Sequence, residues 1–189
     1  MLYNVVNNKF EGVYMDILNY KIDVETMYIK CIEERGYYSS KIFELHGEPI
    51  VITHSPNKLI NSNCKLYSQS YISRKEMTKL LTGIISKPPI IIDLFGNHTF
   101  FSTHSDRVTY NEWFSLRHIK SYEAYRGMTR VTLTNNEQVV IDISKRSFNN
   151  QYLNALKLNY MFTIEMNEYN NKKMSQRKAE FPIVKNENK

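Results

Sequence analysis

The sequence predicts an α+β fold built mostly from antiparallel β-strands, about seven or eight of them. Three observations lead to this fold class. Short runs of β-branched and aromatic residues are separated by Gly, Asn and Pro turn residues along most of the chain. Only two segments carry apolar residues at helical spacing, one in the middle and one near the C-terminus. Strands and helices do not alternate, which argues against a parallel nucleotide-binding sheet.

The first part of the chain predicts three consecutive strands. Residues 1–22 show little pattern and predict no element. Gly36 and Gly47 mark the turns between segments of strand composition. The predicted strands are residues 26–33, 38–45 and 49–55. Residues 55–63, SPNKLINSN, are rich in polar turn formers, so we expect a loop there.

Residues 73–82 predict an amphipathic helix in the middle of the chain. Ser73 and Glu76 have the spacing of a capping box, in which each side chain satisfies a free N–H group at the helix start. Gly83 is a typical helix end. The predicted apolar face consists of Met77, Leu80 and Leu81.

The second half of the chain predicts two β-hairpins and a strand between them. Gly96-Asn97 and Asn135-Asn136 are tight-turn signals. The paired strands are residues 90–95 with 98–103, and residues 130–134 with 138–144. Residues 114–125 have strand composition but imperfect alternation, which predicts one strand with a bulge.

A last helix is predicted over residues 148–162, with Ser147 as its cap and one apolar stripe. Residues 163–189 are polar and basic, so we expect a disordered tail after a single domain that spans residues 1–162. One small apolar island interrupts this tail. It consists of Phe181, Pro182, Ile183 and Val184.

The net charge of +6 is concentrated in the middle of the chain. Residues 56–126 contain ten Lys and Arg but five Asp and Glu, whereas residues 1–55 contain five and eight. This asymmetry favours a polyanionic partner. No apolar run reaches about 18 residues and no secretion signal is present, so we expect a cytoplasmic protein without a membrane span. Cys31 and Cys64 have no spacing typical of a disulfide framework or a metal site.

The usual catalytic motifs are absent from the sequence, which contains no GxSxG, P-loop, GxGxxG or HExxH. His98, His104 and Asp106 lie close together in the chain, but their spacing matches no established metal site. Cys64 with a distant His would be a nucleophilic pair, although a structural cysteine is the simpler interpretation. We therefore expect neither an enzyme nor a bound metal or cofactor.

Basic residues near turns and at a helix start are candidates for nucleic-acid contacts. Arg74, Lys75 and Lys79 would share the face of the 73–82 helix opposite its apolar residues, beside backbone N–H groups that bind phosphate. The alternative is that these side chains simply point into solvent. Further candidates for phosphate or groove contacts are Arg117, Lys120, Lys145, Arg146 and Asn149. Each of these taken singly is equally well an ordinary solvated polar residue.

Three segments together resemble the ComK family of competence transcription factors, in the same order and at near-equal spacing over residues 24–185. The first is CKLYSQSYISRK, which contains a Cys before a Ser-Tyr and an Arg-Lys pair. The second is KPPIIID, and the third is SFNNQ at the start of the last helix. The matching residues are Cys64, Ser70, Tyr71, Arg74, Lys75, Lys87, Pro88, Pro89, Ile90, Asp93, Ser147, Phe148, Asn150 and Gln151. Ser68 and Ser73 depart from the pattern, because the family is expected to have glycines there.

The resemblance implies an activator of DNA-uptake genes that binds double-stranded DNA at paired A-run and T-run boxes, largely through the minor groove. It also implies an oligomer that helps RNA polymerase and has no helix-turn-helix. The apolar island at 181–184 would then be recognised by an adaptor of an ATP-dependent protease. The competing hypothesis from the residues alone is a non-catalytic interaction module that binds a peptide or an acidic partner.

Overall fold

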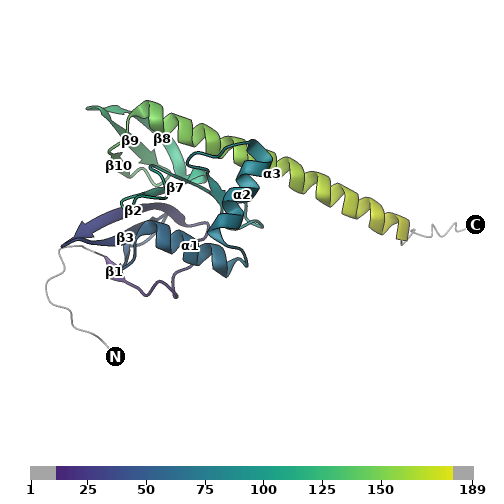
Figure 1. Ribbon diagram of the computed structural model, residues 1–189, viewed down its shortest axis with the longest axis horizontal. Coiled ribbons are helices and arrows are strands. Elements are labelled where there is room, and N and C mark those ends of the chain that lie inside the picture. The colour runs from purple at the N-terminus through teal and green to yellow at the C-terminus, as the bar shows by residue number, and fades with distance from the viewer. Residues whose placement is uncertain (1–11, 181–189) are drawn as a thin grey trace, which may run out of the picture.

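The computed structural model describes residues 12–180, and side chains as far as Gln176. Figure 1 shows the two β-sheets, the short helix α1 (Pro56–Leu66) away from the long helix, a second short helix that runs up to the long helix, and the long helix projecting beyond the rest of the molecule. The larger sheet has seven strands in the order β1-β4-β3-β2-β7-β6-β5, and the smaller has the order β10-β9-β8. All strand pairs are antiparallel except β1 with β4. The predicted α+β fold with mostly antiparallel strands is confirmed.

The seven-stranded sheet contains both strand pairs expected in its part of the chain. Its strands are β1 (Val13–Tyr14), β2 (Thr26–Glu34), β3 (Tyr37–Glu44), β4 (Ile50–Ile52), β5 (Ile90–Ile91), β6 (Thr99–Ser102) and β7 (Trp113–Ser115). The β2–β3 and β5–β6 pairs confirm the predicted neighbours. The two-residue β1 was not predicted, and together with the division of the 114–125 segment into two strands it brings the strand total among the described residues to ten, above the expected seven or eight.

Alternating side chains of this sheet build two separate cores. Ile29, Phe100 and Trp113 face the core that contains α1 (Pro56–Leu66). The next residues along two of these strands, Phe101 and Phe114, face the opposite core, which the small sheet and α3 (Lys145–Glu180) complete. Since successive side chains of a strand point to opposite faces, a sheet covered on both sides needs apolar residues at consecutive positions.

Helix α1 occupies the segment predicted as a loop, so that prediction is wrong. Pro56 stands at the first helical position, where its fixed φ favours a helix and its missing N–H costs nothing. Leu59, Ile60, Asn63 and Cys64 then form a buried stripe. The Asn63 side chain accepts a hydrogen bond from the backbone N–H of residue 22 and donates to the carbonyl of residue 59. Its polar side chain is therefore satisfied inside the core.

Helix α2 (Tyr71–Thr82) begins earlier than predicted. Its cap is Ser70, whose hydroxyl accepts a hydrogen bond from the Ser73 backbone N–H, so the predicted capping role of Ser73 is wrong. Gly83 ends the helix in a left-handed conformation, as predicted. The turn between α1 and α2 contains Ser68 with a φ of 61°, a conformation that glycine adopts more easily. This left-handed conformation gives a physical reason why a glycine is expected at the position that Ser68 occupies in this chain.

The predicted strand over residues 114–125 is divided between the two sheets. It forms the end of β7, a 3-10 turn over Leu116–His118, and β8 (Ile119–Tyr125). The break coincides with His118, which is buried. Its two ring nitrogens are satisfied there by hydrogen bonds with the hydroxyl of Thr134 and the carbonyl of Val24. Strand β8 continues into β9 (Met128–Leu133) and β10 (Gln138–Ile141), and the β9–β10 pair confirms the predicted hairpin.

Helix α3 extends to Glu180, so the prediction that it ends at 162 before a disordered tail is wrong for residues 163–180. No Gly or Pro falls between Lys145 and Glu180, and the polar composition does not prevent helix formation. Packing ends near Phe162 and Met166, beyond which the helix leaves the rest of the molecule (Figure 1). The apolar island at 181–184 lies outside the described residues.

Candidate nucleic-acid interface

The Arg74 side chain is not available as an exposed phosphate contact, which corrects the prediction made for it. It has no solvent exposure, and its guanidinium donates to the Ile92 carbonyl at 3.0 Å and to the Tyr67 carbonyl at 3.4 Å. Burial lowers the pKa of Arg74. Thr78 lies on the same buried side, where its hydroxyl donates to the Pro89 carbonyl at 2.7 Å.

The predicted faces of α2 are therefore rotated relative to the real ones. Leu80, assigned to the apolar face, is 86% exposed, and Ile72 is 63% exposed. Although α1 and α2 are two short helices joined by four residues, the exposed side chains of α2 include a single cation, Lys79, beside Glu76 and two large apolar residues, which is unlike a DNA-reading helix.

Lys75 is half-buried and forms an ion pair with Asp106, with 2.6 Å between Nζ and Oδ2. Burial alone would raise the pKa of Asp106, but the hydrogen bond and charge of Lys75 hold it below its ordinary value. The Lys75 ammonium also lies 4.9 Å from the centre of the Tyr71 ring. Lys79, on the next turn of the helix, is exposed.

A basic pocket of about 430 Å³ opens beside this ion pair. Two loops form it, and α1 holds one of them in place. Asn57 of α1 donates to the carbonyls of Asp106 and Val108 and accepts from the indole N–H of Trp113 at 2.9 Å. The pocket is lined by Lys75, Ile85, Ser86, Lys87, Pro88, Ser105, Asp106 and Arg107. Three cations against one carboxylate give it a net positive charge.

A second basic cluster lies at one end of the three-stranded sheet. The two-residue turn between β8 and β9 contains Arg126, and the strand register pairs Thr129 with Ile141 near the same end. The Thr129 hydroxyl also donates to the Ile143 carbonyl, which holds the segment just before α3 against the start of β9, two residues after the turn. The cluster, which we call the basic sheet end, consists of Arg126, Arg130, Lys145 and Arg146.

Of the remaining candidates, Arg117 and Lys120 lie apart from both clusters, whereas Asn149 follows Arg146 by three residues on α3. Arg117 donates to the Gly96 carbonyl at 3.1 Å, beside a pocket of about 290 Å³. Lys120 donates to Asn136 at 2.6 Å at the other end of the small sheet. Asn149 accepts a hydrogen bond from the Tyr122 hydroxyl at 2.7 Å and is half-buried.

Two features of this surface were not among the predicted contacts. Lys87 and Arg107 come from different loops, and no local pattern in the sequence places them beside Lys75. Arg126 did have a sequence signal: a two-residue Arg-Gly connection between strand-like segments is a tight turn, and a turn exposes its side chains.

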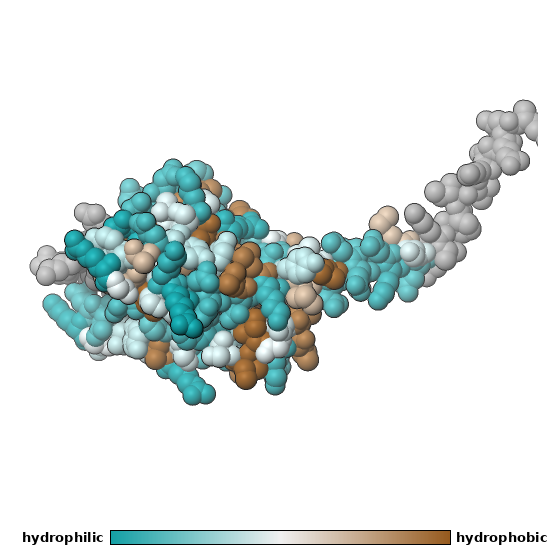
Figure 2. Space-filling view, turned by 90° about the horizontal axis from the view of Figure 1, so that it is seen from above, coloured by the Kyte–Doolittle hydropathy of each residue, from teal (hydrophilic) through white to brown (hydrophobic). Residues whose placement is uncertain are grey.

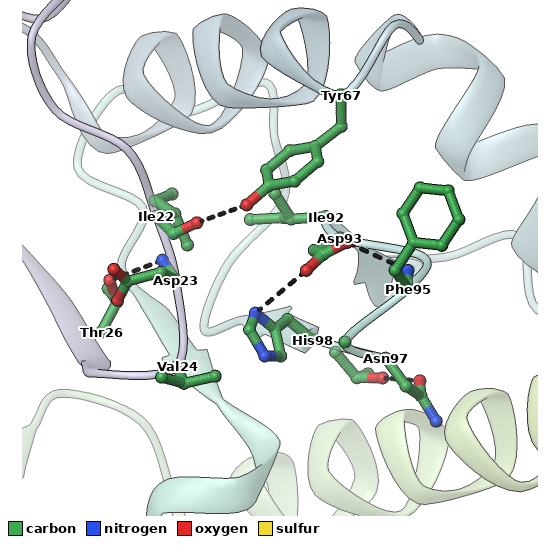
Figure 3. A network of polar contacts seen from close by, with 12 residues as sticks. Ile22, Asp23, Val24, Thr26, Tyr67, Ile92, Asp93, Phe95, Asn97 and His98 are labelled. Atoms are coloured by element: carbon green, nitrogen blue, oxygen red, sulfur yellow. Dashed lines mark hydrogen bonds and ion pairs between the residues drawn. The ribbon is translucent and has the colours of Figure 1, made fainter.

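The histidines form no metal site in the part of the chain that the structure describes, where no group of three His, Cys, Asp or Glu side chains could hold an ion. His98 is buried, with its Nδ1 4.0 Å from Oδ2 of Asp93 (Figure 3), and burial lowers its pKa. Neighbouring polar contacts in the same view hold the backbone, such as the bond from Tyr67 to the Ile22 carbonyl at 3.1 Å. Among residues 12–180, no helix is long and apolar enough to cross a membrane.

Comparison with known proteins places this chain in a family. The ComK protein family matches residues 17–167, well over half of the chain. The competence transcription factor of Bacillus subtilis (strain 168) is 30% identical over 134 residues, which cover 70% of this chain and 69% of that protein. No solved structure matches the chain significantly. The chain therefore belongs to the ComK family of competence transcription factors, which are DNA-binding regulators and not enzymes.

Proposed function

We propose that this protein is a sequence-specific activator of competence genes that reads A·T-rich paired boxes, largely through the minor groove. Family membership and the name of the B. subtilis relative support a role in transcription. The observation that carries the DNA surface is the basic sheet end, where the β8–β9 turn and the start of α3 gather four cations. Arg and Lys beside exposed turns are typical of minor-groove binders.

In this proposal, affinity comes mainly from lysine and arginine side chains that displace counterions from phosphates. Lys145 and Arg146 would contact phosphates beside the basic sheet end, and Lys79 would do so on α2. The basic pocket formed by Lys75, Lys87 and Arg107 would hold a further phosphate. Arg117 stays a proposed contact, as do Lys120 and Asn149, which would exchange their present hydrogen-bond partners for DNA.

We also propose a homo-oligomer, because paired boxes call for two copies on one duplex. An exposed apolar surface next to the projecting helix supports this idea, and Figure 2 shows apolar side chains gathering there. Lys157 of α3 donates to the Thr82 carbonyl at the end of α2, which brings α3 close to the end of α2 and to Ile85 just after it, where several apolar side chains are exposed. We call them the apolar face, which consists of Leu80, Ile85, Leu153, Leu156 and Tyr160.

The remaining partners are proposed from the family resemblance. The bound oligomer would assist RNA polymerase at promoters, in the cytoplasm on the nucleoid. An adaptor of an ATP-dependent protease would recognise Phe181, Pro182, Ile183 and Val184. Removal of these four residues should therefore lengthen the half-life of the protein in cells.

A binding titration tests the proposed function. Two duplexes of equal length, one with A-run and T-run boxes and one rich in G·C, are titrated at two salt concentrations. Tighter binding to the first that persists as salt rises supports minor-groove recognition of A·T. Equal affinity for the two duplexes, lost for both as salt rises, would show that the basic surface attracts DNA without reading its sequence. Absence of binding even at low salt would favour the interaction module instead.

A further inference from the structure

Two hairpins in this protein have the same Arg-Gly turn. Arg35-Gly36 joins β2 to β3, and Arg126-Gly127 joins β8 to β9. In each hairpin, the residues just before and just after the turn pair with each other. The φ angles are 52° and 81° in the first turn and 51° and 81° in the second. Positive φ at both positions is typical of a type I′ turn, which prefers Asn or Gly at its first position. The turn geometry therefore does not explain why an arginine stands there.

The surroundings of the two turns differ in charge. Arg35 follows Glu33 and Glu34, so local acidic groups balance its charge. Arg126 has no acidic neighbour at adjacent positions and lies in the basic sheet end, where Lys145 and Arg146 are also exposed. The second turn therefore has a net positive surrounding, because its four cations outnumber the nearby carboxylates of Glu123 and Asp142.

One aromatic ring holds two guanidinium groups at this second turn. The Arg130 guanidinium carbon lies 3.8 Å from the centre of the Tyr125 ring, and that of Arg126 lies 5.3 Å from it. Arg130 is already paired with Glu123 at 2.9 Å. Arg126 shares the ring but forms no ion pair within the described part of the chain, so its charge is available to an anionic partner. Glu123 already offsets part of the repulsion between the two guanidinium groups, and an anion beside Arg126 would offset the rest.

We infer that the Arg126-Gly127 turn lies over the minor groove and inserts the Arg126 guanidinium against the base edges of an A·T-rich box. This inference rests on the proposed function. The minor groove is only roughly 6 Å wide, so the paired strands stay outside it, whereas a single arginine side chain at the tip of a two-residue turn can reach into it. A Cβ placed on Gly127 would meet nothing within 4 Å, so the glycine leaves the tip slim and is not required by internal packing.

Charge explains why the turn would favour A·T boxes. A-tracts narrow the minor groove and strengthen its negative potential, which attracts arginine in particular. With the Arg126 side chain in the groove, the exposed Lys145 and Arg146 at the start of α3 would neutralise the flanking phosphates. Arg126 thus sets sequence preference, whereas the two residues of α3 supply affinity that does not depend on sequence.

The test compares Arg126→Ala with Arg35→Ala in the full chain. Both changes remove an exposed arginine from the same turn geometry, so Arg35→Ala is the matched control for any effect on the turn itself. Affinities for the A·T-box duplex and the G·C-rich duplex are measured at fixed salt. Arg126→Ala should lower the ratio of the two affinities about 10-fold, the effect of losing one base-edge contact, and Arg35→Ala should leave it unchanged.

Several outcomes overturn the inference. If the ratio is unaffected by Arg126→Ala, or falls equally with Arg35→Ala, the turn does not read the groove, and the proposed function still stands. If the unaltered protein shows no A·T preference, the proposed function fails and this inference with it. Because an alanine variant can lose affinity through misfolding, a second measurement uses Arg126→Cys and Arg35→Cys carrying a tethered DNA-cleaving iron chelate. The chelate at position 126 should cut inside the A·T boxes, and cuts elsewhere would overturn the assignment.

Discussion

Replacement of Arg74 by alanine separates a structural role of this residue from a DNA contact. In the structure, its guanidinium is buried and holds the carbonyls of Ile92 and Tyr67, which belong to segments on either side of α2. A phosphate contact would require an exposed side chain on the same helix. The two roles predict opposite results for stability and for salt dependence.

The loss of stability can be estimated from the contacts. The hydrogen bond to Ile92 is charge-assisted and 3.0 Å long, and such bonds contribute about 1.5–3 kcal/mol. Truncation of a fully buried side chain also leaves a cavity. Against this, the Nε and Nη1 atoms have no hydrogen-bond partner among the described residues, and their removal relieves a desolvation cost. We expect a net loss of about 2–4 kcal/mol for Arg74→Ala.

Thermal unfolding followed by circular dichroism measures this loss. For a domain of this size, 1 kcal/mol shifts Tm by about 2–4 °C, so the variant should melt roughly 4–16 °C lower. Arg74→Met fills most of the volume without the charge and should lose less than the alanine variant. Below its melting range, the alanine variant should keep the wild-type slope of log affinity for DNA against log salt. An unchanged Tm together with a slope reduced by about one would refute the structural role and restore Arg74 as a phosphate contact.

Three further predictions use the same assays. Gly96→Ala should lower the free energy of unfolding by about 1–3 kcal/mol, because a Cβ there lies 2.7 Å from Nε2 of His98 and 2.8 Å from Oδ2 of Asp93; an unchanged Tm would contradict this. Burial lowers the pKa of both His98 and His118, so below about pH 6.5 the unfolded chain binds protons that the folded chain does not, and stability should fall as pH drops from 7 toward 5. His118→Gln should reduce that slope in denaturant titrations at several pH values, and an equal slope in both proteins would exclude a contribution from this ring. Arg107→Ala should lower the salt slope of DNA binding by about one and weaken binding to A·T and G·C duplexes alike, whereas a selective loss for one duplex would show that the pocket reads sequence.

Helix α2 shows which features of a candidate site can be predicted from neighbouring residues in the sequence and which cannot. Its existence and its end at Gly83 follow from residues that act within a few positions of each other. The face that it buries does not, because an apolar stripe predicts the buried face only when the surrounding core is apolar. Here the neighbouring segment offers the Ile92 and Pro89 carbonyls, which Arg74 and Thr78 satisfy with their side chains. The same contacts leave Leu80 in solvent.

The sequence by itself determined the fold class, the two predicted hairpins and the basic middle of the chain, because alternation, turn residues and charge are local properties. Only the tertiary structure decided which basic residues meet. Lys87 and Arg107 converge on Lys75 because Asn57 of α1 ties one of their loops to the core. Arg126 meets the start of α3 because strand register closes the small sheet beside it. Such meetings depend on contacts between segments distant in the chain, and no short stretch of sequence specifies them.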